Sequence, residues 1–145
     1  MAALTKERPG RFETITRAKV PLAAGVKAFK GAAAVLDTAD GSPTQGFYLP
    51  AKAAQGLVPR GRFNETADNS GGANGAKLIE VLFHRKFEVI WWNNDTAAPV
   101  TASLRGSDCF FADDQTVSSE DAGRSAAGPV FDVDSSGKFL LVEVR

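Results

Sequence analysis

Residues 132–143, DVDSSGKFLLVE, carry oxygen-bearing side chains at the spacing of a calcium-binding loop. The pattern D-x-D-x-S-G-x5-E matches the loop of an EF-hand, in which a glutamate at the twelfth position, here Glu143, completes the ligand set of the ion. Such a loop needs one helix that enters it and another that leaves it. A tight turn between two strands, with at most a weak cation site on Asp132 and Asp134, is the alternative.

The residues on both sides of this segment favour strands. Pro129 and the β-branched residues near it oppose an entering helix, and beyond the turn apolar side chains recur at every second position up to Val144. Because a strand advances by about 3.3 Å per residue, Glu143 would lie roughly 20 Å from Gly137 and could not bind the same ion. We therefore expect a β-hairpin turn through residues 134–137, with Gly137 at positive φ, and neither a metal nor another cofactor.

Cys109 and His84 are the only cysteine and the only histidine, and together they could form a thiol protease pair. Cys109 precedes two phenylalanines in an apolar run, so a buried structural thiol is the expected role. His84 lies between charged neighbours in FHRKF, which is typical of a solvated strand edge or turn. With one cysteine, neither an intrachain disulfide nor a thiolate metal cluster can form.

The stretch AGPVFDVDSSG is faintly similar to a motif of the trimeric β-barrel dUTPases, with Asp132 in the catalytic place. The aromatic residue that stacks on the base and the serine-rich phosphate motifs of that family are not recognisable here. A nucleophile elbow and a phosphate-binding glycine loop followed by lysine are also missing from the sequence. We therefore expect no catalytic residues and a protein that is not an enzyme.

Seventeen basic and seventeen acidic residues are interspersed along the 145 residues, so the chain presents no broad positive field. We therefore expect neither nucleic acid nor a membrane among its partners. The first residues, MAALTKERPGR, are charged where a secretory signal would be apolar, and the apolar runs are far shorter than a bilayer span. These features predict a soluble protein that is synthesised in a cytoplasm.

Fourteen glycines, seven prolines and ten phenylalanines, with turn clusters at short intervals, favour short strands over long helices. Residues 11–20 alternate charged and apolar side chains, which is typical of a strand with one solvated face. We predict an all-β protein: a small single-domain β-barrel or jelly-roll-like β-sandwich over residues 12–145, preceded by a flexible N-terminal arm over residues 1–11. A chain of this length can bury enough surface to fold without a disulfide or a metal.

The strongest alternation runs through residues 77–92, KLIEVLFHRKFEVIWW, which read as one long bent strand or as two strands that meet at HRK. Trp91 and Trp92 face opposite sides of any continuous strand, so one of them is a candidate for contact with another chain, and we assign this role to Trp92. The odd positions are predicted to point into the core, and they are Ile79, Val81, Phe83, Phe87, Val89 and Trp91.

Residues 67–76, ADNSGGANGA, hold almost nothing that a core could bury. Glycine's access to left-handed conformations favours an exposed, mobile loop here. Both a long hairpin connection and a partner-contacting tip fit this composition, and Asp68 and Asn69 are the candidate contacts of such a tip.

Several segments, taken in order along most of the chain, resemble the small capsid decoration, or cement, proteins of tailed bacteriophages and their prophages. The most specific are the ADNSGGANGA loop and the DDQTVSS…GRSAAG stretch. The others are ALTKER, PLAAGVKAFKGAAAVLD, GLVPRGRFNET and the final VFDVDSSGKFLLVEV.

This resemblance implies a structural virion protein, made in the bacterial host, that binds the outer surface of the assembled capsid and reinforces it against the internal pressure of packaged DNA. Its partners are then the major capsid protein and further copies of itself, in a homo-oligomer for which a trimer is favoured over a dimer. A polar arm can order on the capsid by strand addition or groove binding. A small β binding module, such as a tail component or a carbohydrate-binding domain, is the alternative function. The candidate docking residues are Thr5, Lys6, Glu7, Arg8, Arg11, Asp68, Asn69 and Trp92.

Overall fold

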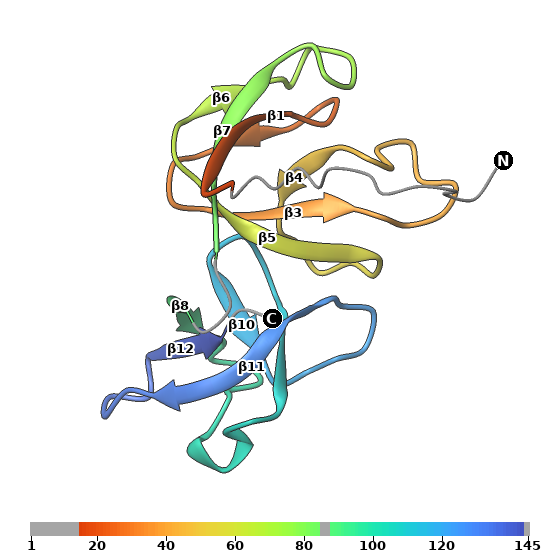
Figure 1. Ribbon diagram of the computed structural model, residues 1–145. Helices are drawn as coiled ribbons and strands as arrows, with labels where there is room; N and C mark the ends of the chain where they lie inside the picture. Colours follow the sequence, from red (N-terminus) through yellow and green to blue (C-terminus); the bar gives the residue numbers. More distant parts are fainter. Residues whose placement is uncertain (1–14, 85–87, 144–145) are drawn as a thin grey trace, which may run out of the picture.

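The computed structural model describes residues 15–84 and 88–143, and strands dominate both ranges, so the all-β prediction is confirmed. The first half of the chain lies in the upper part of Figure 1 and the second half in the lower part. The first half contains β1 (Arg17–Pro21), β2 (Lys27–Ala28), β3 (Ala33–Asp37), β4 (Tyr48–Pro50), β5 (Leu57–Phe63), β6 (Ala67–Asp68) and β7 (Leu78–Phe83). The second half contains β8 (Val89–Asn94), the 3₁₀ helix η1 (Ala102–Leu104), β9 (Asp108–Phe111), β10 (Thr116–Ser118), β11 (Ala126–Val133) and β12 (Phe139–Glu143). The predicted arm, residues 1–11, lies outside the described residues.

Five strands of the first half form an antiparallel sheet in the order β1-β7-β5-β3-β4. The sheet curls until its outer strands meet. Just after β1, Leu22 forms a parallel bridge to Tyr48 of β4, and the amide of Ala23 donates to the Tyr48 carbonyl at 2.8 Å. β2 and β6 pair separately as a two-stranded ribbon. The interior of this assembly contains Val20, Leu22, Ala28, Ala32, Ala34, Phe63, Ile79 and Val81.

Five strands of the second half close into a barrel in the order β10-β8-β12-β11-β9. Neighbouring strands are antiparallel, except that β8 and β10 run parallel. The rings of Trp92 and Phe111 meet edge to face with their centroids 6.3 Å apart, an arrangement that favours tight aromatic packing. The buried residues of the barrel include Trp92, Val100, Cys109, Phe111, Val117, Val130 and Val142.

The curled sheet and the barrel share one topology. In chain order, β1, β3, β4, β5 and β7 of the sheet correspond to β8, β9, β10, β11 and β12 of the barrel, and each neighbouring pair has a counterpart with the same direction. The registers agree as well, so the chain contains two tandem versions of one five-stranded fold. The matched pairs are Ala18–Val81 with Ile90–Val142, Phe63–Val81 with Val130–Val142, Leu36–Tyr48 with Phe111–Val117, and Leu22–Tyr48 with Asn94–Val117.

A β-bulge falls at the same place in both assemblies. In β5 the register shifts at Arg60, immediately before Gly61, and in β11 it shifts at Ala127, immediately before Gly128. Both glycines have positive φ, 156° for Gly61 and 141° for Gly128. A bulge bends its strand, and these two strands are also in contact with each other across the junction of the sheet and the barrel.

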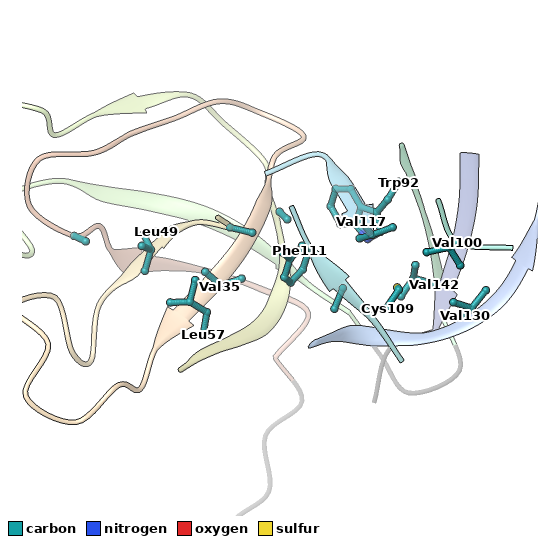
Figure 2. Close-up of a cluster of buried hydrophobic side chains, with 14 residues drawn as sticks. Val35, Leu49, Leu57, Trp92, Val100, Cys109, Phe111, Val117, Val130 and Val142 are labelled. Carbon is teal, nitrogen blue, oxygen red and sulfur yellow. The ribbon is translucent and has the colours of Figure 1, made fainter. Parts of the chain in front are cut away.

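The two assemblies pack through a continuous apolar layer. Figure 2 shows Val35, Leu49 and Leu57 of the sheet on one side, with Phe111 between them and the remaining barrel side chains. The hydroxyl of Ser125 strengthens the junction, because it accepts the amide hydrogen of Leu57 at 2.9 Å and donates to the Ala54 carbonyl at 2.5 Å. Because each buried large apolar side chain stabilises by about 2 kcal/mol, this layer holds the two halves together.

The alternation in residues 77–92 belongs to two strands, β7 in the sheet and β8 in the barrel. Ile79 and Val81 are buried as predicted. The prediction is wrong for β8, where Val89 and Trp91 are 40% and 55% exposed and Trp92 is 6% exposed. The inward parity changes because β8 enters a separate barrel, whose interior is filled from the even positions.

Candidate functional site

The calcium-like segment is a hairpin turn between β11 and β12, as predicted. The amide of Gly137, at φ 71°, donates to the Asp134 carbonyl at 3.0 Å. Asp132 accepts hydrogen bonds from Nε and Nη2 of Arg105 at 2.9 and 2.7 Å, and these bonds lower the pKa of its carboxyl group. Within residues 15–84 and 88–143, no group of three or more His, Cys, Asp or Glu side chains is placed to hold a metal ion.

Cys109 is the buried structural thiol that the sequence predicts. It is fully buried in the barrel, and its Sγ donates to the Gly128 carbonyl at 3.4 Å. Burial raises the pKa of the thiol to about 12. A thiol that stays protonated at neutral pH is a poor nucleophile, so this environment is unlike that of a catalytic cysteine.

The predicted solvated setting of His84 is wrong, because its side chain is only 11% exposed. Nδ1 lies 3.5 Å from Oε2 of Glu88, while Nε2 is buried and has no hydrogen-bond partner. Burial lowers the pKa of His84; Glu88 opposes this effect, and Arg62 adds to it. The charged neighbours in the sequence gave no sign of this burial, because the residues around His84 come from strands of both halves of the chain.

A groove of about 230 Å³ lies at the junction of the sheet and the barrel, beside His84. Both bulged strands contribute to its walls, and four of the twelve lining residues are glycine or alanine. Small side chains leave the space open, while Trp92 and Phe111 supply aromatic surface. The lining residues are Val58, Pro59, Arg60, Gly61, His84, Ile90, Trp92, Asp108, Phe111, Ala126, Ala127 and Gly128.

Two shallower hollows continue from His84 along the surface. One is lined by Thr16, Leu82 and Phe83, and the other by Val89, Ile90 and Trp91. Arg62, His84 and Glu88 line both of these hollows. His84 therefore lines all three depressions.

The outer face of the barrel presents large apolar side chains. Trp91 on β8 and Phe131 on β11 are 55% and 52% exposed, and β12 lies between their strands. The registers equate Trp91 with Lys19, a polar residue of the first assembly. Phe131 is the extra residue at a register shift in β11, between Val130 and Asp132. The first assembly therefore carries a polar side chain where the barrel carries Trp91. We call Trp91 and Phe131 the aromatic face.

The eight predicted docking residues have different positions. Trp92 lies in the barrel core and is only 6% exposed, so apart from the part that lines the groove it offers no surface to a partner, and the exposed tryptophan is Trp91. Asp68 is exposed, and its carboxylate accepts hydrogen bonds from the amide and the hydroxyl of Ser70 at 2.9 and 2.6 Å. The remaining predicted docking residues in the N-terminal arm lie outside the described residues. They are Thr5, Lys6, Glu7, Arg8 and Arg11.

Asn69 is buried and holds the loop in place, whereas the sequence suggested that it could contact a partner at an exposed loop tip. Its side chain is 2% exposed, and Nδ2 donates to the carbonyl oxygens of Leu22, Ala23 and Ala73 at 3.3, 2.9 and 2.9 Å. These bonds tie the glycine-rich loop to the end of β1. The polar composition of the loop concealed this role, because a buried asparagine is recognised only through the backbone groups that it satisfies.

Comparisons of the chain with protein-family models, with curated proteins and with solved structures gave no match. Among the described residues, no helix has the length and apolar character needed to cross a membrane.

Proposed function

We propose that this protein is a structural virion protein that binds the outer surface of the assembled phage capsid and stabilises it against internal DNA pressure. The ordered resemblance of its segments to capsid decoration proteins supports this function. The structural observation that carries the proposal is the aromatic face, where Trp91 and Phe131 are exposed and the equivalent of Trp91 in the first assembly is the polar Lys19.

The aromatic face fits protein docking better than reaction chemistry. An exposed tryptophan is more expected at an interface than on bare surface, because it offers a large apolar area with few rotatable bonds. Burying a large apolar side chain contributes about 2 kcal/mol, so two such residues can anchor a modest interface. The partner in this proposal is the major capsid protein.

The proposal includes a homo-oligomer on the capsid surface, with a trimer preferred over a dimer. An oligomer that touches several capsid subunits gains effective concentration, so each contact can be weak. Binding only to the assembled shell stabilises that shell by linkage. The balanced charge, seventeen basic and seventeen acidic residues, lets many copies lie side by side without strong repulsion, and it argues against nucleic acid as a direct partner.

The test is co-sedimentation of the purified protein with expanded capsids that lack it, followed by the disruption temperature of the capsids. We expect binding at micromolar concentration and a raised disruption temperature. The double variant Trp91→Lys and Phe131→Asn should fold normally, because both side chains are more than half exposed, and it should bind at least tenfold more weakly.

The matched control is Phe29→Asn, because Phe29 is 54% exposed but belongs to the first half of the chain. It removes a comparable exposed aromatic side chain and should leave capsid binding unchanged. Failure of the wild-type protein to bind capsids at micromolar concentration would count against the proposed function. Equal weakening by both variants would show that the aromatic face is not the docking surface.

A further inference from the structure

The glycine-rich loop before β7 contains the one asparagine of the chain that precedes a glycine, Asn74. The backbone nitrogen of the next residue can attack the side-chain amide of an asparagine. Glycine hinders this attack least, because it has no Cβ atom. By its covalent chemistry, Asn74 is therefore the asparagine of this chain most open to spontaneous deamidation. The other asparagines are followed by larger residues, which are Glu65, Ser70, Asn94 and Asp95.

The folded loop holds both reacting groups in hydrogen bonds. Oδ1 of Asn74 accepts the amide hydrogen of Ala24 at 2.8 Å, and Nδ2 donates to the Pro43 carbonyl at 2.8 Å. The amide of Gly75, whose nitrogen would be the nucleophile, donates to the Leu22 carbonyl at 2.9 Å. The nitrogen must lose this hydrogen and the Asn74 side chain must turn toward it, so all three bonds oppose the reaction.

Asn69 fastens the same loop from its other end. Its Nδ2 atom donates to the carbonyl oxygens of Leu22 and Ala23, which follow β1, and to the carbonyl of Ala73, which directly precedes Asn74. Loss of these bonds would free the segment that holds Asn74. The two asparagines therefore share the task of keeping the loop against the end of β1.

We propose that Asn74 is a deamidation site that the folded loop protects, and that the reaction there unfastens the loop from the end of β1. In the first step, the Gly75 nitrogen forms a bond to Cγ of Asn74. The Cγ–Nδ2 bond breaks, and ammonia leaves with the proton that the Gly75 nitrogen gives up. Water then opens the resulting succinimide: attack at Cγ leaves aspartate, and attack at the main-chain carbonyl carbon leaves isoaspartate.

Neither product can restore all the bonds of the native loop. An ionised aspartate has acceptors only, so it would place a charged oxygen beside the Pro43 carbonyl in place of a donor. Isoaspartate adds one carbon atom to the main chain, which moves the Gly75 amide relative to the Leu22 carbonyl. The reaction therefore favours the open loop. The inference goes beyond the proposed function and does not depend on it.

The test compares the full wild-type chain in mildly alkaline buffer with the same chain unfolded in guanidinium chloride, both in water enriched in ¹⁸O. Peptide mapping by mass spectrometry measures deamidation at Asn74, and the ¹⁸O label separates it from deamidation during digestion in ordinary water. We expect the unfolded chain to react at Asn74 at least about tenfold faster than the folded chain. Equal rates, or no reaction at Asn74 in the unfolded chain, would overturn the proposal.

The variant Asn69→Ala loosens the loop without changing the reacting residues. It should speed deamidation of Asn74 in the folded protein at least about tenfold, because the bond to the Ala73 carbonyl is lost. Ser70→Ala is the matched control, since it removes one surface hydrogen bond and should leave the rate unchanged. Equal rates in the two variants would contradict protection by the loop. Should Asn69→Ala not fold, the wild-type comparison decides the protection alone.

The variant Asn74→Asp reproduces one product and tests the unfastening. Hydrogen exchange of the Gly75 amide should be at least about tenfold faster than in the wild type, because the loop leaves the Leu22 carbonyl more often. The amide of Phe111, which donates to the Ser125 carbonyl at 3.0 Å in the second half of the chain, should exchange at the wild-type rate. Unchanged exchange at Gly75 would refute the unfastening.

Discussion

Gly61 and Gly128 occupy the same position in the two five-stranded assemblies. Each follows a bulged residue, each has positive φ, and each lies opposite an equivalent residue, Ala34 for Gly61 and Cys109 for Gly128. Both glycines line the groove at the junction. Two walls of the groove therefore contain the same local irregularity, one from each assembly.

Gly61→Ala should destabilise the protein by about 2 to 4 kcal/mol, because φ is positive and the added Cβ would lie 1.9 Å from the Leu82 carbonyl oxygen. Urea unfolding followed by circular dichroism measures this change. Gly71→Ala is the control, since a methyl group added at Gly71 would meet no atom within 4 Å, and it should change stability by less than about 0.5 kcal/mol. Equal effects of the two substitutions would contradict the steric explanation.

Strand alternation predicted the fold class, and two of the six residues that it assigned to the core are buried, whereas Phe83 is half-buried and Phe87 lies outside the described residues. Ile79 and Val81 are buried because their strand has one apolar face, and Gly137 makes the expected turn because its φ is positive. The parity of β8 was not predictable in the same way. The parity depends on whether the odd or the even residues of β8 point into the barrel. The pairing of β8 with β10 and β12, which lie farther along the chain, determines this.

The groove could not be predicted from the sequence, because the residues that line it are distant from one another in the chain. Arg60, His84 and Ala127 meet only after both assemblies have folded and packed. The two assemblies also share little beyond alternation, as KLIEVLF of β7 and KFLLVEV around β12 illustrate. The equivalence appears in the registers and bulges, which depend on backbone pairing more than on side-chain identity.

Asn69→Ala should cost about 2 to 3 kcal/mol, because three backbone carbonyl oxygens would lose the donor that Nδ2 supplies. Denaturant unfolding gives the value. The exposed neighbour Ser70 provides the comparison: Ser70→Ala removes one surface hydrogen bond and should have an effect below about 0.5 kcal/mol. A small effect of Asn69→Ala would mean that the loop is not fastened through this amide.

Cys109 should react with a thiol reagent only when the barrel opens. Its side chain is fully buried and its pKa is raised to about 12, so almost no thiolate exists at neutral pH. We expect labelling by 5,5′-dithiobis(2-nitrobenzoic acid) to be slow in buffer and complete in urea above the unfolding midpoint. Fast labelling of the folded protein, at the rate of a free thiol, would show that the barrel interior is accessible.

Stability should fall as the pH drops from 7 toward 5, and His84 should be the cause. Burial lowers the pKa of His84 in the folded state, with Glu88 opposing and Arg62 adding to the effect. Near the ordinary value of about 6.5 the unfolded chain therefore binds more protons than the folded protein. The contribution is fully present above the unfolded pKa and is lost as the pH falls through the folded pKa. Urea midpoints across this range measure the slope, and His84→Phe should remove it; an unchanged slope in that variant would assign the effect to other groups.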